Sequence, residues 1–291
     1  VEGSNSLQNS IERYIGLMCG TSIDGVDVAL VEFDGNSSQL VGAYLHPIEK
    51  DLKDKLRSLC SLNSRECYLE NFAHRVELLG ELDTRMGHVF AESVNAFLAK
   101  HQINPETIKA IGSHGQTIRH QPAQASPFSL QIGDANIIAH QTGITTIADF
   151  RRMDIAAGGQ GAPLAPAFHN AAMRSKSENR IILNLGGIAN ITLLPKDKLI
   201  SVLGFDTGTA NTLLDVWFMQ NHPEASQDYD KDATFAQQGQ VDNKLLDRLC
   251  DDPYFDLPPP KSTGREYFSI EWLWNKLNEL GYKITPANVQ R

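Results

Sequence analysis

Gly20-Thr21-Ser22-Ile23-Asp24-Gly25-Val26-Asp27 lies between two apolar runs, Tyr14 to Met18 and Val26 to Phe33. The first run is continuous and the second partly alternates apolar and polar residues, which is typical of strands. We therefore predict a hairpin of two strands joined by this turn. Its glycines let a ligand approach the main chain closely, Thr21 and Ser22 offer hydroxyl groups, and turn amides can bind an anion. The alternative is a plain hairpin turn.

Two carboxylates, Asp24 and Asp27, follow the hydroxyl residues of this turn. They can hold Mg²⁺ through water molecules, because Mg²⁺ takes few carboxylates and keeps much of its hydration shell. The sequence contains neither the Walker pattern GxxxxGK[ST] nor a convincing GxGxxG, which argues against a P-loop or a Rossmann nucleotide site. The turn itself is therefore the candidate phosphate site.

Strands and helices alternate along the rest of the first half. Polar, Gly-rich segments at 112–125 and 150–163 are predicted to be loops, and the second is expected to cross between two domains. The apolar patterns predict further strands at 39–47, 108–111, 128–132 and 144–148, and helices around Leu52 to Leu59, within 67–102 and at 135–141.

The second half repeats the strand order of the first half, not its residues. Three strands and a helix opening near Asn211 are predicted again, and the strands are at 180–185, 191–194 and 199–205, with later helices at 244–250 and 269–280. This pattern predicts a duplicated α/β fold with a cleft between two lobes. We expect residues 1–11 to be a cloning scar or a disordered start, 12–149 the N-terminal lobe and 150–291 the second lobe.

Gly204-Phe205-Asp206-Thr207-Gly208-Thr209-Ala210-Asn211 is the second chemical signal, at a strand end that runs into a helix. Asp206 can act as a base, and the small residues and helix start can bind phosphate. The alternative is a carboxylate that only forms the turn or caps the helix. Asn184 to Asn190 is a third Gly-rich turn, equally consistent with a tight hairpin.

The amino-acid composition favours a globular protein and argues against several kinds of partner. The 291 residues are 41% hydrophobic and 21% charged, which predicts a folded, soluble chain. The net charge of −9 argues against nucleic-acid and anionic-membrane partners, and no apolar run approaches the roughly 18 residues of a membrane span. Four cysteines without CxxC spacing fit a reducing cytoplasm.

Seven stretches in the same order resemble the anhydro-N-acetylmuramic acid kinase family, within the superfamily of sugar kinases, heat-shock-70 proteins and actin. They are GTSIDGVD from Gly20, IGSHGQTIRH from Ile111, QIGD from Gln131, ADFRRMDIAAGGQGAPL from Ala148, NLGGIAN from Asn184, GFDTG from Gly204 and PPKSTGREYF from Pro259. The resemblance implies a duplicated ribonuclease-H-like (actin-like ATPase) fold. Against the family pattern, the C-terminal part, with its adenosine loop, is expected to be missing after Arg291.

This resemblance implies ATP-dependent phosphorylation of 1,6-anhydro-N-acetylmuramic acid at O6. Hydrolytic opening of the anhydro ring accompanies the transfer and gives N-acetylmuramic acid 6-phosphate, in peptidoglycan recycling. ATP and Mg²⁺ are the implied cofactors, and a cytoplasmic homodimer is the implied form.

Residue by residue, the resemblance assigns ATP binding to Gly20, Thr21, Ser22, Ile23, Asp24, Gly25, Val26 and Asp27. Asp206 matches the catalytic base. His114, Gln116, Arg151, Arg152 and Gln160 match segments bordering the sugar cleft, where an Arg can pair with the lactyl carboxylate. The two arginines are adjacent, so we expect at most one of them to point inward. Lys261, Ser262, Thr263 and Arg265 are expected to order a loop or to touch substrate.

Two other functions stay open from the sequence. A non-catalytic sugar- or nucleotide-binding module could use the same cleft as a sensor. An actin-like or chaperone-like ATPase would keep the phosphate turns, but it does not predict the GGQGAP and SHGQ stretches.

Overall fold

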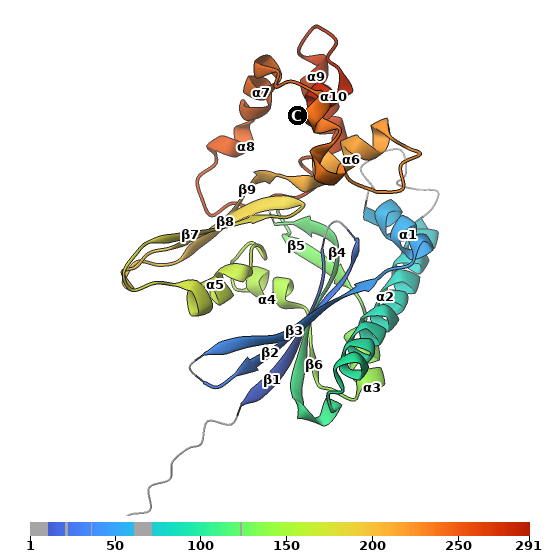
Figure 1. Ribbon diagram of the computed structural model, residues 1–291, viewed down its shortest axis with the longest axis vertical. Coiled ribbons are helices and arrows are strands. Elements are labelled where there is room, and N and C mark those ends of the chain that lie inside the picture. The colour runs from blue at the N-terminus through green and yellow to red at the C-terminus, as the bar shows by residue number, and fades with distance from the viewer. Residues whose placement is uncertain (1–10, 21–22, 36, 61–71, 123) are drawn as a thin grey trace, which may run out of the picture. The chain divides into compact units, whose positions relative to one another are not determined.

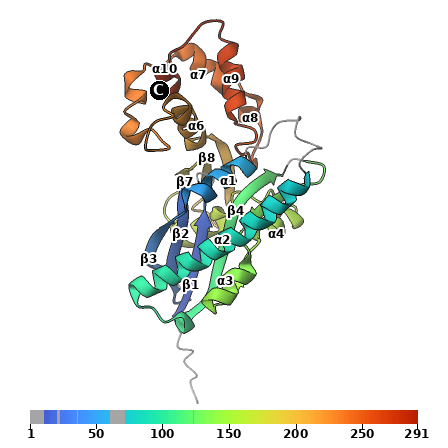
Figure 2. The same cartoon turned by 90° about the vertical axis from the view of Figure 1, so that its right-hand side faces the viewer.

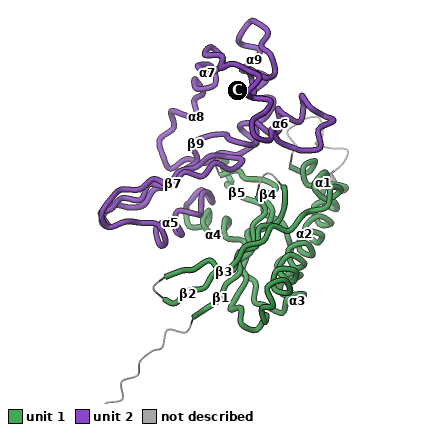
Figure 3. Tube along the Cα trace, viewed as in Figure 1, with its two compact units in different colours: residues 1–158 green, residues 159–291 purple. Residues whose placement is uncertain are grey.

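The computed structural model describes residues 11–20, 23–35, 37–60, 72–122 and 124–291, so Thr21 and Ser22 lie outside the described residues. The chain divides into two compact units, 1–158 and 159–291 (Figure 3). Unit 1 holds one mixed sheet and its helices, and unit 2 holds a smaller sheet with the remaining helices.

Unit 1 is built on a sheet with the order β3-β2-β1-β4-β5, and β6 lies beside β4. Neighbours among β1, β2 and β3 are antiparallel, whereas β4 runs parallel to β1 and to β6. This order confirms the predicted ribonuclease-H-like α/β fold. The elements are β1 (Glu12–Cys19), β2 (Gly25–Phe33), β3 (Ser38–Pro47), α1 (Lys50–Cys60), α2 (Phe72–His101), the 3-10 turn η2 (Pro105–Thr107), β4 (Ile108–Gln121), β5 (Phe128–Ile132), α3 (Ala135–Thr142), β6 (Thr146–Ile147) and α4 (Phe150–Ala156) (Figure 1).

The core of unit 1 lies between one face of the sheet and the helices α1, α2 and α3, which Figure 2 shows together in front of the strands. Side chains alternate along β1, so Ile15, Leu17 and Cys19 are buried while Gly16 and Met18 are exposed on the other face. Gly133 has φ +115°, and a Cβ there would lie 2.4 Å from the ring of Phe90 in α2. Close packing at this point thus requires glycine.

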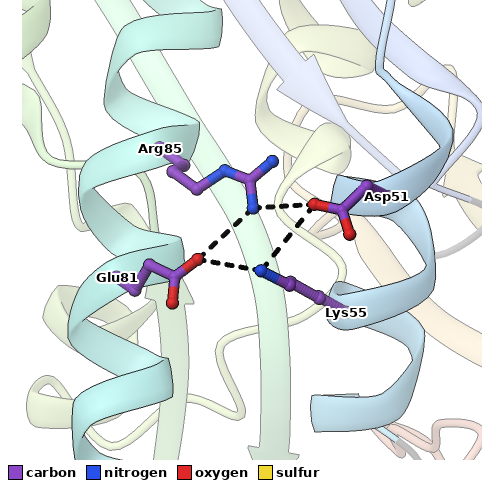
Figure 4. Close-up of polar contacts among 4 residues, drawn as sticks. All are labelled: Asp51, Lys55, Glu81 and Arg85. Atoms are coloured by element: carbon purple, nitrogen blue, oxygen red, sulfur yellow. Dashed lines mark hydrogen bonds and ion pairs between the residues drawn. The ribbon is translucent and has the colours of Figure 1, made fainter.

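Four alternating charges join α1 to α2 (Figure 4). Arg85 donates to Asp51 over 3.1 Å and to Glu81 over 3.3 Å, and Lys55 lies 3.1 Å from Glu81 and 3.7 Å from Asp51. Each cation therefore bridges both helices. The hydrogen bond and charge of Lys55 lower the pKa of Glu81 below its ordinary value. Because the side chains are solvent-exposed, such pairs contribute little individually, and the buried leucines of α1 hold the two helices together.

Two segments predicted as loops are regular structure. β4 continues through 112–121, because it pairs with β5 from Gln116 to Gln121 and buries Ile118 in the core. The polar, glycine-containing sequence of this stretch has low strand propensity, which pairing overrides. Within 150–163, residues Phe150–Ala156 form α4, which belongs to unit 1.

Unit 2 begins with α5 (Ala165–Met173), a helix that the sequence patterns did not predict. Its sheet has the antiparallel order β7-β8-β9, followed by α6, so strands and helix appear in the predicted order. Leu213, Trp217 and Phe268 lie in its core. The remaining elements are β7 (Arg180–Leu185), β8 (Ile188–Leu194), β9 (Leu203–Thr209), α6 (Asn211–Asn221), η3 (Lys231–Ala233), η4 (Ala236–Gln238), α7 (Asn243–Cys250), α8 (Pro253–Asp256), α9 (Ile270–Asn278) and α10 (Pro286–Gln290).

Substituting Phe90 tests the packing of unit 1. Phe90 is fully buried, so Phe90→Ala is expected to lower the free energy of unfolding by about 3–5 kcal/mol, measured by urea denaturation. Phe128, which is 44% exposed, provides the control, and Phe128→Ala should cost less than about 1 kcal/mol. Equal losses for the two variants would contradict the assignment of Phe90 to the core.

Candidate active site

The turn between β1 and β2 is anchored by a buried side chain. Ile23 is fully buried with φ +56°, and its amide donates to the Gly20 carbonyl over 3.2 Å. A left-handed conformation is unusual for a β-branched residue, and such strain concentrates at functional sites. Gly25 cannot carry a side chain, because a Cβ there would lie 2.8 Å from the His46 carbonyl oxygen. Packing therefore fixes Ile23 and Gly25 where the chain enters β2.

Asp24 and Asp27 are both exposed at this turn, and Asp24 accepts a hydrogen bond from the Gly25 amide over 3.1 Å. Partial burial and the charge of Asp24 raise the pKa of Asp27 above its ordinary value. Two carboxylates that repel each other fit a divalent cation, which relieves that repulsion. Among the described residues, no three His, Cys, Asp or Glu side chains gather as a metal site.

A β-bulge in β4 lies beside this turn. Leu17 pairs with Ser113 and Cys19 with Gln116, so His114 and Gly115 together face Met18. Gly115 has φ +74°, and a Cβ there would lie 2.7 Å from the Ile132 carbonyl oxygen. Asp27 is opposite Met18 on the other side of β1, so neighbouring strands present Asp27, Met18 and His114 on the face away from the core.

His114 and Arg151 come together on this face. The Nδ1 of His114 lies 2.8 Å from the Gly115 carbonyl oxygen, which can only accept, so His114 Nε2 accepts from Arg151 Nε over 2.8 Å. Burial and the Arg151 charge lower the pKa of His114 to about 4, and the same causes lower that of His120 to about 4. Both imidazoles are therefore neutral at pH 7, and the positive charge belongs to Arg151.

The other predicted sugar-cleft residues have different surroundings. Arg152 is exposed and pairs with Asp149 over 2.7 Å, so only Arg151 of the two arginines meets His114. Gln116 is fully buried, and its Oε1 has no partner among the residues described. Gln160 belongs to unit 2, where its Nε2 donates to the Pro260 carbonyl over 3.2 Å.

In unit 2, Asp206 of β9 is a buried carboxylate, 4% exposed. Its Oδ2 accepts hydrogen bonds from Ser262 Oγ over 2.9 Å and from the Thr263 amide over 3.0 Å. These charge-assisted bonds compensate for its removal from water. Ser262 and Thr263, singled out in the sequence without a definite role, thus hold Asp206.

A second bulge places Asp206. Ala189 pairs with Gly208 and Asn190 with Asp206, so Thr207 is the extra residue, and its hydroxyl donates to the Ala189 carbonyl over 3.2 Å. Gly208 has φ +148°, and a Cβ there would lie 2.9 Å from the ring of Phe255. The second glycine of the GFDTG motif therefore lets β9 bend two residues after Asp206.

Sequence reasoning missed two residues behind Asp206, Tyr254 and Asp252. The Tyr254 hydroxyl donates to the main-chain carbonyl of Asp206 over 2.8 Å, and Asp252 caps the helix that carries Tyr254. The Asp-Pro pair at 252–253 is a helix-start signal that could have located this helix. Nothing in the sequence pattern indicates its contact with Asp206.

Comparisons with known proteins give a family match over nearly the whole chain. A family model described as anhydro-N-acetylmuramic acid kinase matches residues 12–291. An anhydro-N-acetylmuramic acid kinase of Coxiella burnetii is 50% identical over 279 residues, which are 96% of this chain and 71% of the relative. One from Photobacterium profundum is 50% identical over 281 residues, 97% of this chain and 71% of the relative.

Solved structures are more distant. An Aquifex aeolicus member of the Ppx/GppA family aligns over 97% of this chain and 87% of its own, with a TM-score of 0.35 and 9% identity. A ROK hexokinase from Thermus thermophilus aligns over 93% and 90%, with a TM-score of 0.28 and 16% identity.

One further finding concerns membranes: among the residues that the structure describes, none of the helices is long and apolar enough to cross one. The family match spans both units and includes the segment after β1 and the part of β9 that carries Asp206. The sequence-based recognition is confirmed: this chain belongs to the anhydro-N-acetylmuramic acid kinase family.

Proposed function

We propose that this protein uses ATP to phosphorylate 1,6-anhydro-N-acetylmuramic acid at O6 and opens the anhydro ring by hydrolysis in the same reaction. The product is N-acetylmuramic acid 6-phosphate, an intermediate of peptidoglycan recycling. The observation that supports this most is the buried Asp206 carboxylate, held by Ser262 and Thr263 beside the bulge in β9. Family membership supports a kinase, and therefore the use of ATP.

Asp206 is the proposed general base. Water attacks the anomeric carbon and gives its proton to the Asp206 carboxylate, while the bond from that carbon to O6 breaks. The released O6 attacks the γ-phosphorus of ATP, and the bond to the β-phosphate oxygen breaks, so ADP leaves. A base for this step must be fixed in direction, and the two hydrogen bonds to Asp206 Oδ2 meet that requirement.

The turn Gly20 to Asp27 is the proposed phosphate site. The buried Ile23 and the packing of Gly25 against β3 support main-chain contacts to the phosphates. Asp24 and Asp27 are the residues that would hold Mg²⁺ through water. When bound, Mg²⁺ neutralises charge on the phosphate oxygens.

Arg151 is the proposed partner of the sugar's lactyl carboxylate. His114 is neutral and accepts from Arg151 Nε, so it orients the guanidinium without cancelling its charge. A planar guanidinium can bind a carboxylate through two parallel hydrogen bonds. His114, Gln116, Arg152 and Gln160 stay predictions as sugar contacts.

The cellular location and the oligomeric state of the protein are inferred as well. We infer a cytoplasmic enzyme, because ATP, its phosphate donor, is a cytoplasmic metabolite. The net charge of −9 supports small-molecule substrates over nucleic acid. A homodimer is inferred from the family resemblance, and light scattering of the purified protein that gives the mass of one chain would exclude it.

Asp206→Asn tests the base. It removes the proton acceptor while keeping size, so kcat should fall by about 10²–10⁴-fold, measured as formation of the ring-opened 6-phosphate by the full-length protein. ATP affinity measured by calorimetry should change little. Asp247→Asn, at an exposed carboxylate of α7, is the matched control and should keep wild-type kcat. Unchanged turnover in Asp206→Asn would remove Asp206 from its proposed role.

Asp27→Asn tests the metal-binding carboxylates. Removing one charge should raise the Mg²⁺ concentration for half-maximal activity several-fold. Without Mg²⁺, the same variant should bind ATP as well as or better than wild type, because less negative charge faces the phosphates. Weaker nucleotide binding without Mg²⁺ would show that Asp27 only supports the turn.

Arg151→Lys tests sugar recognition. Lysine keeps the charge but loses the planar fork, so KM for the anhydro sugar should rise about tenfold, with KM for ATP nearly unchanged. Arg152→Lys should have the smaller effect, because Arg152 pairs with Asp149. Steady-state kinetics with each substrate varied distinguish the two arginines, and a larger effect at Arg152 would reverse their assignment.

A further inference from the structure

The main chain of Asp206 is fixed on both sides of its Cα. Its amide donates to the Lys261 carbonyl over 2.9 Å, and its carbonyl accepts from the Tyr254 hydroxyl over 2.8 Å. β9 is the outer strand in the sheet order β7-β8-β9, so main-chain groups of Asp206 that point away from β8 meet no further strand among those described. The Lys261 carbonyl and the Tyr254 hydroxyl therefore supply hydrogen bonds to Asp206 at this edge of the sheet.

Tyr254 is itself held firmly. It is 4% exposed, its amide donates to Asp252 Oδ1 over 3.0 Å, and its carbonyl accepts from Lys261 Nζ over 2.9 Å. The same ammonium lies 4.6 Å from the centre of the Tyr254 ring. Lys261 thus joins the helix that carries Tyr254 to the segment that carries Ser262 and Thr263.

Asp252 holds the start of α8, the helix that carries Tyr254. It is 5% exposed and accepts from Tyr267 Oη and from Trp272 Nε1, each over 2.8 Å, and Lys276 Nζ lies 3.5 Å away. Burial alone would raise the pKa of Asp252, but its hydrogen bonds outweigh burial and the pKa lies below its ordinary value. The carboxylate therefore stays ionised at neutral pH and keeps all of these donors.

We propose that Tyr254 is a positioning residue for Asp206: its hydroxyl fixes the Asp206 main chain, and thereby the direction in which the carboxylate meets the attacking water. Tyr254 is buried, so it is assigned a role that acts through Asp206. This inference rests on the proposed role of Asp206 as the base. Small errors in placing a reacting group are costly, since a misplacement of about 1 Å can lower a rate by about 10²-fold.

The test removes one oxygen atom. Tyr254→Phe keeps the ring, the contact with Lys261 and the packing of the aromatic cluster, so the protein should fold. In the full-length protein, kcat is expected to fall about tenfold, with KM for the sugar and for ATP each within about twofold of wild type. Active-site titration, or a correction for the folded fraction, removes any contribution from a loss of folded protein. A lower kcat with unchanged KM values then reports a displaced base.

Tyr282→Phe is the matched control. It removes a tyrosine hydroxyl of unit 2 that donates to Asp242, the N-cap of α7, and not to Asp206 or Asp252. Both variants should lower the urea midpoint by small amounts, but Tyr282→Phe should keep wild-type kcat. Equal loss of kcat in the two variants, or wild-type kcat in Tyr254→Phe, overturns the proposal.

Asp206→Asn, measured alongside, separates this inference from the proposed function. If Asp206→Asn is inactive and Tyr254→Phe has wild-type kcat, Asp206 stays the base and only the role of Tyr254 is wrong. If Asp206→Asn keeps wild-type turnover, the proposed function and the role of Tyr254 both fail.

Discussion

The hydrogen bonds that hold the buried Asp206 carboxylate are the constraint on which the rest of the site depends. A carboxylate taken out of water is strongly destabilising unless donors replace its hydration. Ser262 Oγ and the Thr263 amide provide them, and they come from a segment 56 and 57 residues further along the chain. The fold of unit 2 therefore has to bring the middle of β9 and the 261–263 segment together, and Lys261 contributes to this by contacting both Asp206 and Tyr254.

A β-bulge occurs in both strands that carry candidate site residues, β4 and β9. In β4, Gly115 lets a bulge place His114 opposite Met18, and in β9, Thr207 is the extra residue next to Asp206. Bulges occur often beside active sites, because they redirect a side chain without ending the strand. Each bulge stands close to a glycine with positive φ, Gly115 or Gly208, where a side chain would collide with a neighbour.

The sequence was sufficient to predict the order of strands and helices along the chain and the chemical motifs. Apolar alternation and glycine turns are local properties, so they can be recognised without the folded structure. It predicted loops at 112–125 and 150–163, where β4 and α4 occur, since polar stretches carry no local signal of their partners. The separation of Arg151 from Arg152 depends on which side of α4 meets His114. The hydroxyl of Tyr254 on Asp206 joins residues 48 positions apart, and such pairing is set only by the folded chain.

In the proposed reaction, Asp206 activates a water molecule that attacks the sugar while phosphate is transferred. The most direct measurement is the reaction carried out briefly in ¹⁸O-labelled water, with the products analysed by mass spectrometry before the free sugar exchanges oxygen. The account predicts that the label enters the sugar at the anomeric carbon and is absent from phosphate, in a product with an open anhydro bridge. Labelled inorganic phosphate, or a phosphorylated sugar that keeps the bridge, would contradict it.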